Sequence, residues 1–185
     1  MKAYGFTNKE IRELDERNEM LVRFPDISSY HYTIEEVLRL YDIQTNVNVR
    51  HHSNIYLWSN DDPWFIASKS NEPELLCKSA EEAISIYKDQ GLHGMTLRSY
   101  VAFADAYRKR NGDYPDRNKQ TFLLGETWRC GVPVAGFDRN ILILDVWKDY
   151  FKAPDVGSRY VVLPPTSIFQ KKKSSKRAYR LPDNP

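Results

Sequence analysis

The sequence has few features that would cross-link the chain or anchor it in a membrane. Its 185 residues include two cysteines, Cys77 and Cys130, and neither has a second cysteine or a close histidine at zinc-ligand spacing. No apolar run approaches the roughly 20 residues that span a bilayer, and residues 1–6 lack the apolar segment of a secretion signal. We therefore expect a soluble, cytoplasmic protein with reduced thiols and no membrane partner.

The signatures of common enzyme classes are also missing. The sequence contains no Gly-rich phosphate loop, no nucleophile elbow and no Ser/His/Asp set. His51-His52 resembles the histidine pair of a one-metal nuclease, but no further ligand follows at short spacing, so a polar loop is expected there. Asp116 and Glu126 resemble the acidic pair of a restriction-type nuclease, but the lysine expected after the second acid is absent.

Charge is divided unevenly along the chain. Residues 156–185 contain seven Lys and Arg against Asp183 alone, whereas residues 1–155 contain twenty Lys and Arg against twenty-four Asp and Glu, a net charge of −4. Clustered cations bind phosphates more effectively than overall charge does. The basic end is therefore either a polyanion-binding segment or a solvated tail.

Three segments show a capping box, in which a Ser or Thr is followed three residues later by Glu. These begin at Thr7, Thr33 and Ser79, and each is followed by helical apolar spacing that after Thr7 extends to Leu21 and Val22. A fourth helix is predicted from Thr96 to Asn111-Gly112. The sequence thus predicts four helices in its first 112 residues.

Aromatic and β-branched runs predict the strands. Residues 54–58 and 64–67 flank an Asn/Asp/Pro cluster and predict a β-hairpin, and further strands are expected at 121–124, 141–146 and 159–163. This order predicts an α+β fold, with helices and a hairpin in the N-terminal half and one mixed sheet, covered on a face by helices, in the C-terminal half. We expect one domain over residues 1–169, in which 1–45 is a candidate helical sub-module, and a basic tail over 170–185.

The C-terminal third holds the most distinctive pattern. The apolar run Ile141-Leu142-Ile143-Leu144 ends on Asp145, and the strand Arg159-Tyr160-Val161-Val162-Leu163 leads into Pro164-Pro165-Thr166-Ser167-Ile168-Phe169. A basic patch and Arg177-Ala178-Tyr179-Arg180-Leu181-Pro182 follow. A buried strand that ends on a carboxylate is a common way for a sheet to present a metal ligand.

Residues 128–182 resemble the archaeo-eukaryotic primase-polymerase domains of plasmid and viral replication proteins. In that family an apolar strand with an Asp-x-Asp pair precedes a strand reading roughly Tyr-Val-Val-Ala-Pro-Pro-Ser-x-His and a Gly-x-x-Tyr-x-x-Leu-Pro tail. The glycine-containing stretch 128–136 resembles the turn before the catalytic strand. Asp145 then matches the first carboxylate of the pair and Asp155 matches a third family acid.

The chain departs from the family at the positions that make it catalytic. Trp147 stands where the second carboxylate would be, and an indole cannot hold a metal ion. Phe169 occupies one usual histidine position, although Ser167 remains, and only nine residues separate Asp145 from Asp155, so the strand with the triphosphate-binding histidine is missing. The resemblance therefore implies a reduced member with little or no polymerase activity.

We therefore expect a nucleic-acid-binding, replication-associated protein of a virus or plasmid that needs no cofactor, with single-stranded DNA or RNA, and a replication or host protein, as partners. Two alternatives stay open: an active primase-polymerase that uses Mg²⁺ or Mn²⁺, and a non-enzymatic protein-interaction or inhibitor module. The candidate metal ligands are Asp145, Asp155 and Asp149. The candidate nucleotide-binding residues are Ser167 and Arg159. The candidate phosphate-binding residues are Lys171, Lys172, Lys173, Lys176, Arg177 and Arg180. The candidate base-stacking residues are Trp58 and Tyr56 on the predicted hairpin.

Overall fold

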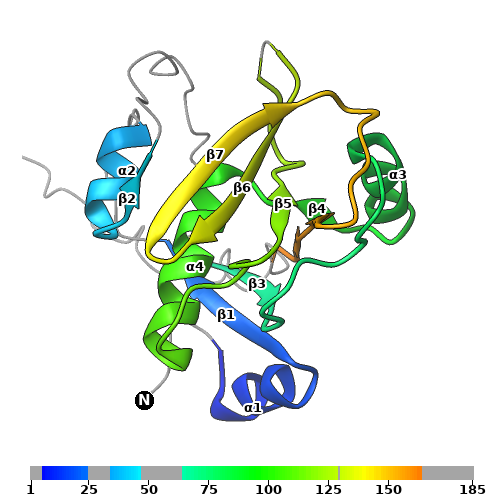
Figure 1. Ribbon diagram of the computed structural model, residues 1–185. Coiled ribbons are helices and arrows are strands. Elements are labelled where there is room, and N and C mark those ends of the chain that lie inside the picture. Colours follow the sequence, from blue (N-terminus) through cyan, green and yellow to red (C-terminus); the bar gives the residue numbers. More distant parts are fainter. Residues whose placement is uncertain (1–5, 25–33, 47–63, 129, 164–185) are drawn as a thin grey trace, which may run out of the picture.

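The fold is of the predicted α+β class. A computed structural model describes residues 6–24, 34–46, 64–128 and 130–163, and combines helices with a mixed sheet of five strands (Figure 1). The helices of these residues are α1 (Asn8–Glu16), α2 (Ile34–Leu40), α3 (Ala80–Asp89) and α4 (Leu97–Asn111). The strands are β1 (Glu19–Arg23), β2 (Gln44–Thr45), β3 (Trp64–Ser68), β4 (His93–Gly94), β5 (Gln120–Phe122), β6 (Val132–Asp138), β7 (Ile141–Trp147), β8 (Val156–Ser158) and β9 (Tyr160–Val161).

Local capping interactions set the helix boundaries much as the sequence predicts. Thr7 and Ser79 each form a complete capping box with the glutamate three residues later, and Thr96 forms one with Ser99. Helix α4 ends at Gly112, whose φ of 81° is a left-handed conformation that suits glycine. The predicted box at Thr33 lies outside the described residues.

The first helix is shorter than predicted. Helix α1 stops before Asn18, which has a positive φ of 58°, and Leu21 and Val22 lie in strand β1. Alternate residues of β1 are buried, as expected of a strand with one face on the core. The apolar positions after Thr7 therefore belong to a helix followed by a strand, and not to the single helix that their spacing predicts.

Only the second half of the predicted hairpin of 54–58 with 64–67 is described, as strand β3. It pairs antiparallel with β1, so that Ile66 lies opposite Leu21. On its other edge, Ile66 exchanges two backbone hydrogen bonds of 2.9 Å with Val162. Strand β3 thus has a neighbour on each edge, and both neighbours are distant from it in sequence. Residues 54–58 themselves lie outside the described residues.

The five-stranded sheet has the order β2-β7-β6-β5-β8. Strands β7, β6 and β5 are antiparallel neighbours, whereas β2 runs parallel to β7 and β8 runs parallel to β5. Strands β6 and β7 form the long hairpin at the centre of Figure 1. A separate two-stranded sheet joins β4 to β9.

The two faces of the sheet have different surroundings. Side chains on one face, among them Phe137, Leu142 and Leu144, pack with α4 in the main core. The same core includes Val22 and Val37, so β1 and α2 are integrated with the C-terminal strands. The opposite face carries only a small buried cluster, formed by Ala80, Phe122, Val132, Val134 and Val156. On that second face the exposed residues lie along β7, at Ile141 and Asp145.

Candidate nucleic-acid interface

The predicted metal ligands Asp145 and Asp155 do not come together. Asp145 lies on β7 and Asp155 immediately precedes β8, with β6 and β5 between these strands. Three strand spacings of about 4.8 Å place β7 and β8 roughly 14 Å apart. Carboxylates that share a two-metal site must hold ions roughly 3.5–4 Å apart. The expected shared metal site is therefore not formed.

Local hydrogen bonds occupy the carboxylates of Asp145 and Asp149. Asp145 accepts from Trp147 Nε1 at 2.9 Å and from the backbone N–H of Val146 at 2.7 Å. Asp149 accepts from the backbone N–H of Tyr150 at 3.1 Å. Within the described ranges, no three His, Cys, Asp or Glu side chains are grouped so that they could hold a metal ion.

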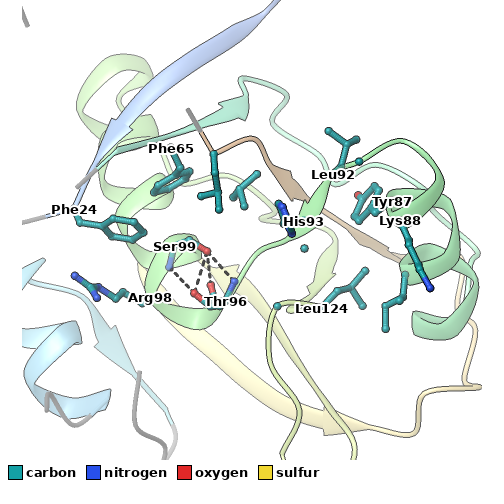
Figure 2. A pocket seen from close by; sticks show the side chains of 16 residues that line it. Phe24, Phe65, Tyr87, Lys88, Leu92, His93, Thr96, Arg98, Ser99 and Leu124 are labelled. Atoms are coloured by element: carbon teal, nitrogen blue, oxygen red, sulfur yellow. Dashed lines mark hydrogen bonds between the residues drawn. The ribbon is translucent and has the colours of Figure 1, made fainter. Parts of the chain in front are cut away.

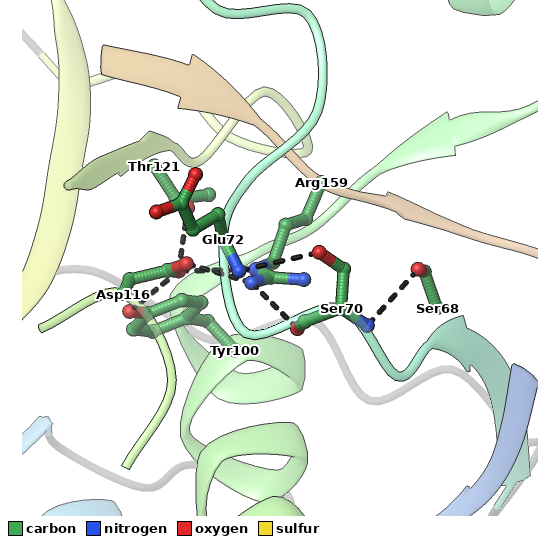
Figure 3. A network of polar contacts seen from close by, with 7 residues as sticks. All are labelled: Ser68, Ser70, Glu72, Tyr100, Asp116, Thr121 and Arg159. Carbon is green, nitrogen blue, oxygen red and sulfur yellow. Dashed lines mark hydrogen bonds and ion pairs between the residues drawn. The ribbon is translucent and has the colours of Figure 1, made fainter. Parts of the chain in front are cut away.

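Arg159 lies in the interior, not on a nucleotide-binding surface. Its residue exposure is 1%, and its guanidinium donates to Asp116 through Nε at 3.0 Å and through Nη2 at 2.6 Å (Figure 3). Asp116, also 1% exposed, accepts further hydrogen bonds from Tyr100 at 3.0 Å and Thr121 at 2.7 Å. The expectation for Arg159 is thus corrected, because its charge is already bound to a buried carboxylate.

This buried pair connects segments that are far apart in sequence. Arg159 Nη2 also donates to the backbone carbonyl of Ser70 at 3.0 Å, and the guanidinium lies 4.8 Å from the centre of the Phe103 ring. Burial opposes the charge of Arg159, but the attraction of Asp116 outweighs it and raises the pKa of Arg159. Burial, reinforced by Asp116, raises the pKa of Tyr100. At neutral pH the network is therefore a charged pair with a neutral phenol donor.

Asp116 and Glu126, the acidic pair noted in the sequence, have separate structural roles. Glu126 accepts from the backbone N–H of Leu97, at the start of α4, and from Trp128 Nε1 at 3.2 Å. Burial raises the pKa of the Glu126 carboxyl. A nuclease would need both carboxylates on one metal ion, whereas one of these stabilises a helix terminus and the other a buried arginine.

Two neighbouring hollows lie beside the loop that follows α4. One, of about 600 Å³, lies beside the C-terminal end of α4, and the other, of about 450 Å³, lies over β6 and β7. They share the lining residues Arg117, Asn118 and Asp138. We call the second hollow the sheet groove; its lining residues are Arg117, Asn118, Lys119, Gln120, Gly136, Phe137, Asp138, Ile143, Trp147 and Asp155.

A glycine lets the loop that borders the sheet groove approach the sheet. A Cβ atom on Gly136 would lie 2.7 Å from the backbone oxygen of Lys119, which is closer than real contacts allow. Any larger residue would therefore push the loop that carries Arg117 and Lys119 away from β6. The position of these two cations beside the sheet depends on that close approach.

Trp147 lines the sheet groove in a defined orientation. Its ring meets Phe122 edge-on at 6.3 Å and Phe151 edge-on at 4.7 Å between ring centres, and Asp145 holds its Nε1. Two exposed aromatic side chains follow in the next turn, Tyr150 at 67% and Phe151 at 47% exposure. In the sequence, Trp147 stands out only because it replaces an expected carboxylate. Trp147 follows Asp145 by two residues on one strand, so the two side chains lie on the same face of the sheet, and this alternation is the signal that places it there.

The other predicted contacts cannot be placed. Trp58, Tyr56 and Ser167 lie outside the described residues, as do the six cations of the basic segment, Lys171, Lys172, Lys173, Lys176, Arg177 and Arg180. The groove and its aromatic side chains are therefore known from the structure, whereas the basic segment is known from the sequence.

No protein-family model, no curated protein and no solved structure matches this chain. Among the helices that the structure describes, none has the length and apolar character needed to cross a membrane.

The buried pair gives a first testable prediction. Replacing Asp116 with Asn should lower the free energy of unfolding by about 3–5 kcal/mol, because it leaves the Arg159 charge buried without a counter-charge. The control is Asp113→Asn, whose partner Arg117 has a half-exposed side chain, and its cost should stay below about 1 kcal/mol. Urea unfolding followed by circular dichroism measures both, and equal costs would contradict the role assigned to the pair.

Proposed function

We propose that this protein binds single-stranded nucleic acid in a replication setting, without polymerising it, through the sheet groove and the basic segment. The observation that carries the proposal is the fixed indole of Trp147, which lines an open groove bordered by Arg117 and Lys119. The replication setting rests on the resemblance of residues 128–182 alone.

The groove suits an unpaired strand for two physical reasons. Unpaired bases expose their faces, and stacking on an aromatic side chain contributes about 1–3 kcal/mol per base. The contacts that hold Trp147 in one orientation reduce the entropy that it would lose on binding. Arg117 and Lys119 lie on the same groove and supply positive charge for phosphates.

The acids near the groove argue against a polymerase. Asp155 lines the sheet groove, but Asp145 lies on a strand separated from β8 by two others, and its carboxylate is bonded to Trp147. Two-metal phosphoryl transfer requires carboxylates that converge on neighbouring ions. The strand order therefore favours the binding alternative over the active primase-polymerase.

A protein-interaction module is the second candidate. Tyr150 and Phe151 are exposed side by side, and aromatic residues are enriched at protein interfaces. The net charge of −4 on residues 1–155 would suit a basic partner. This candidate predicts no oligonucleotide binding at the groove, so the experiments below separate the two.

Replacing Trp147 with Leu should weaken the binding of a labelled single-stranded oligonucleotide by about 5- to 150-fold, because one stacked base is lost. The control is Ile141→Ala on the same strand and the same face of the sheet, which does not line the groove. Fluorescence anisotropy measures affinity, and urea unfolding verifies that both variants are folded. Unchanged affinity of a folded Trp147→Leu protein would rule out the groove as a stacking site.

The basic segment should make binding strongly dependent on salt. About three to five phosphate contacts imply a slope of log affinity against log salt on the order of −2 to −4. Removing residues 170–185 should flatten this slope without unfolding the protein, because the described core ends before them. A full-length variant with its six cations changed to Gln controls for chain length. A slope that stays equally steep in both variants would show that the segment does not contact phosphates.

Primer extension should be undetectable or very slow, even with Mn²⁺, because no group of carboxylates among the described residues converges on a metal site. Replacing Trp147 with Asp should not restore it, since two strands would still lie between β7 and the strand that follows Asp155. Gel electrophoresis of the products formed on a primed template measures the extension. Robust extension by the unmodified chain that disappears in Asp145→Ala would establish the polymerase alternative instead.

A further inference from the structure

A second cavity lies at the N-terminal end of α4, whereas the hollow of about 600 Å³ lies at the C-terminal end of the same helix. It has a volume of about 800 Å³ and is enclosed by α3, β4 and the residues around Leu124 (Figure 2). Its walls are largely apolar and aromatic, and include Phe65, Tyr87 and Val161. The volume is within the range of about 300–1,000 Å³ that is typical of small-molecule sites.

Basic side chains also line this cavity. They are Lys88 on α3, His93 on β4 and Arg98 on α4, and no carboxylate is found among its described lining residues. The guanidinium of Arg98 lies 4.6 Å from the centre of the Phe24 ring, also in the lining. A ligand inside would therefore meet apolar surface on several sides and the basic side chains of Lys88 and His93.

Backbone N–H groups at the N-terminal end of α4 already have hydrogen-bond acceptors. The side chains of Thr96 and Ser99 form the capping box of α4, and Glu126 accepts from the backbone N–H of Leu97. Figure 2 shows the hydrogen bonds between Thr96 and Ser99 beside the cavity. The attraction for an anion therefore comes from Lys88 and His93 and not from the N–H groups of Leu97 and Ser99.

The walls of the cavity are fixed before any ligand binds. Met95, between β4 and α4, donates to the backbone oxygen of Arg159 at 3.1 Å and accepts from Gly125 at 2.9 Å. A Cβ atom on Gly94 would lie 2.4 Å from Leu124 Cβ, so these two segments touch as closely as a glycine permits. Preformed apolar pockets with a few polar groups are the usual form of a ligand site.

From these observations we infer that the cavity binds a small molecule with an apolar or aromatic body and one anionic group. The body would lie among Phe65, Val161 and Leu124, and the anion would face Lys88 and His93. This site goes beyond the proposed function, since none of its lining residues lines the sheet groove. Its ligand and a nucleic-acid strand would bind independently.

Two fluorescent probes with the same apolar body test the inference on the full chain. Anilinonaphthalene sulfonate has an anionic group, and N-phenylnaphthylamine lacks it. We expect both to bind with a stoichiometry of one, the sulfonate at least about threefold more tightly because of the basic side chains. We also expect the sulfonate to raise the melting temperature, since a ligand of the folded state stabilises it. Absence of saturable binding would overturn the inference, and would mean that the chain itself or solvent fills the cavity.

Variants at the rim locate the binding. The double variant Lys88→Gln/His93→Gln, at two exposed positions, should weaken the sulfonate about three- to tenfold and leave the neutral probe unchanged. Lys9→Gln on α1 is the control for loss of one exposed charge. Ile84→Trp, at a rim position that is 44% exposed, should weaken both probes at least about tenfold by narrowing the cavity.

The result that would overturn the site is equally specific. Sulfonate affinity unchanged in both the double variant and Ile84→Trp would show that the probe binds elsewhere. Oligonucleotide affinity of the same variants should equal that of the unmodified chain. The site and the proposed function can therefore fail separately.

Discussion

The ion pair of Asp116 with Arg159 is the interaction on which the arrangement of this fold most depends. Beyond the side-chain pair, the backbone of Asp116 adopts a positive φ of 55°, donates to Asn71 at 2.8 Å and accepts from Phe137 at 3.2 Å. The loop fixed in this way carries Arg117 and Lys119 to the sheet groove. The backbone of Arg159 in turn holds Met95, before α4, at the edge of the second cavity. The two residues of this buried pair thus lie in the segments that border both candidate sites.

The sequence predicts well those features that arise from neighbouring residues. The helices after Thr7, Ser79 and Thr96 follow from caps within four residues, and β7 follows from one continuous apolar run. It predicts poorly which strands pair, because pairing depends on contacts across long separations. Strand β1 meets β3 more than forty residues away, and β6 and β5 lie between β7, which carries Asp145, and β8, which follows Asp155.

The candidate site illustrates the same limit. A pattern of acids along a sequence indicates a metal site only if the strands that carry them are neighbours, and the order β7-β6-β5-β8 separates Asp145 from Asp155. The pairing of Asp116 with Arg159 has no signal in the sequence, since the two residues are 43 positions apart. Trp147 can be noticed in the sequence, but only the contacts of its side chain with Asp145, Phe122 and Phe151 show that the indole has a defined position on the surface.

The outer strands of the five-stranded sheet restrict how a second polypeptide can approach it. Strand β8 exchanges backbone hydrogen bonds with Glu74 through Ser158, at 2.7 and 2.9 Å, and accepts another from Cys77 through Val156 at 3.2 Å. The opposite edge is formed by β2, which pairs over only two residues. A partner strand would therefore find the β8 edge already occupied at Val156 and Ser158. Growth of this sheet by strand addition at the β8 edge, whether in a complex or in an aggregate, is disfavoured.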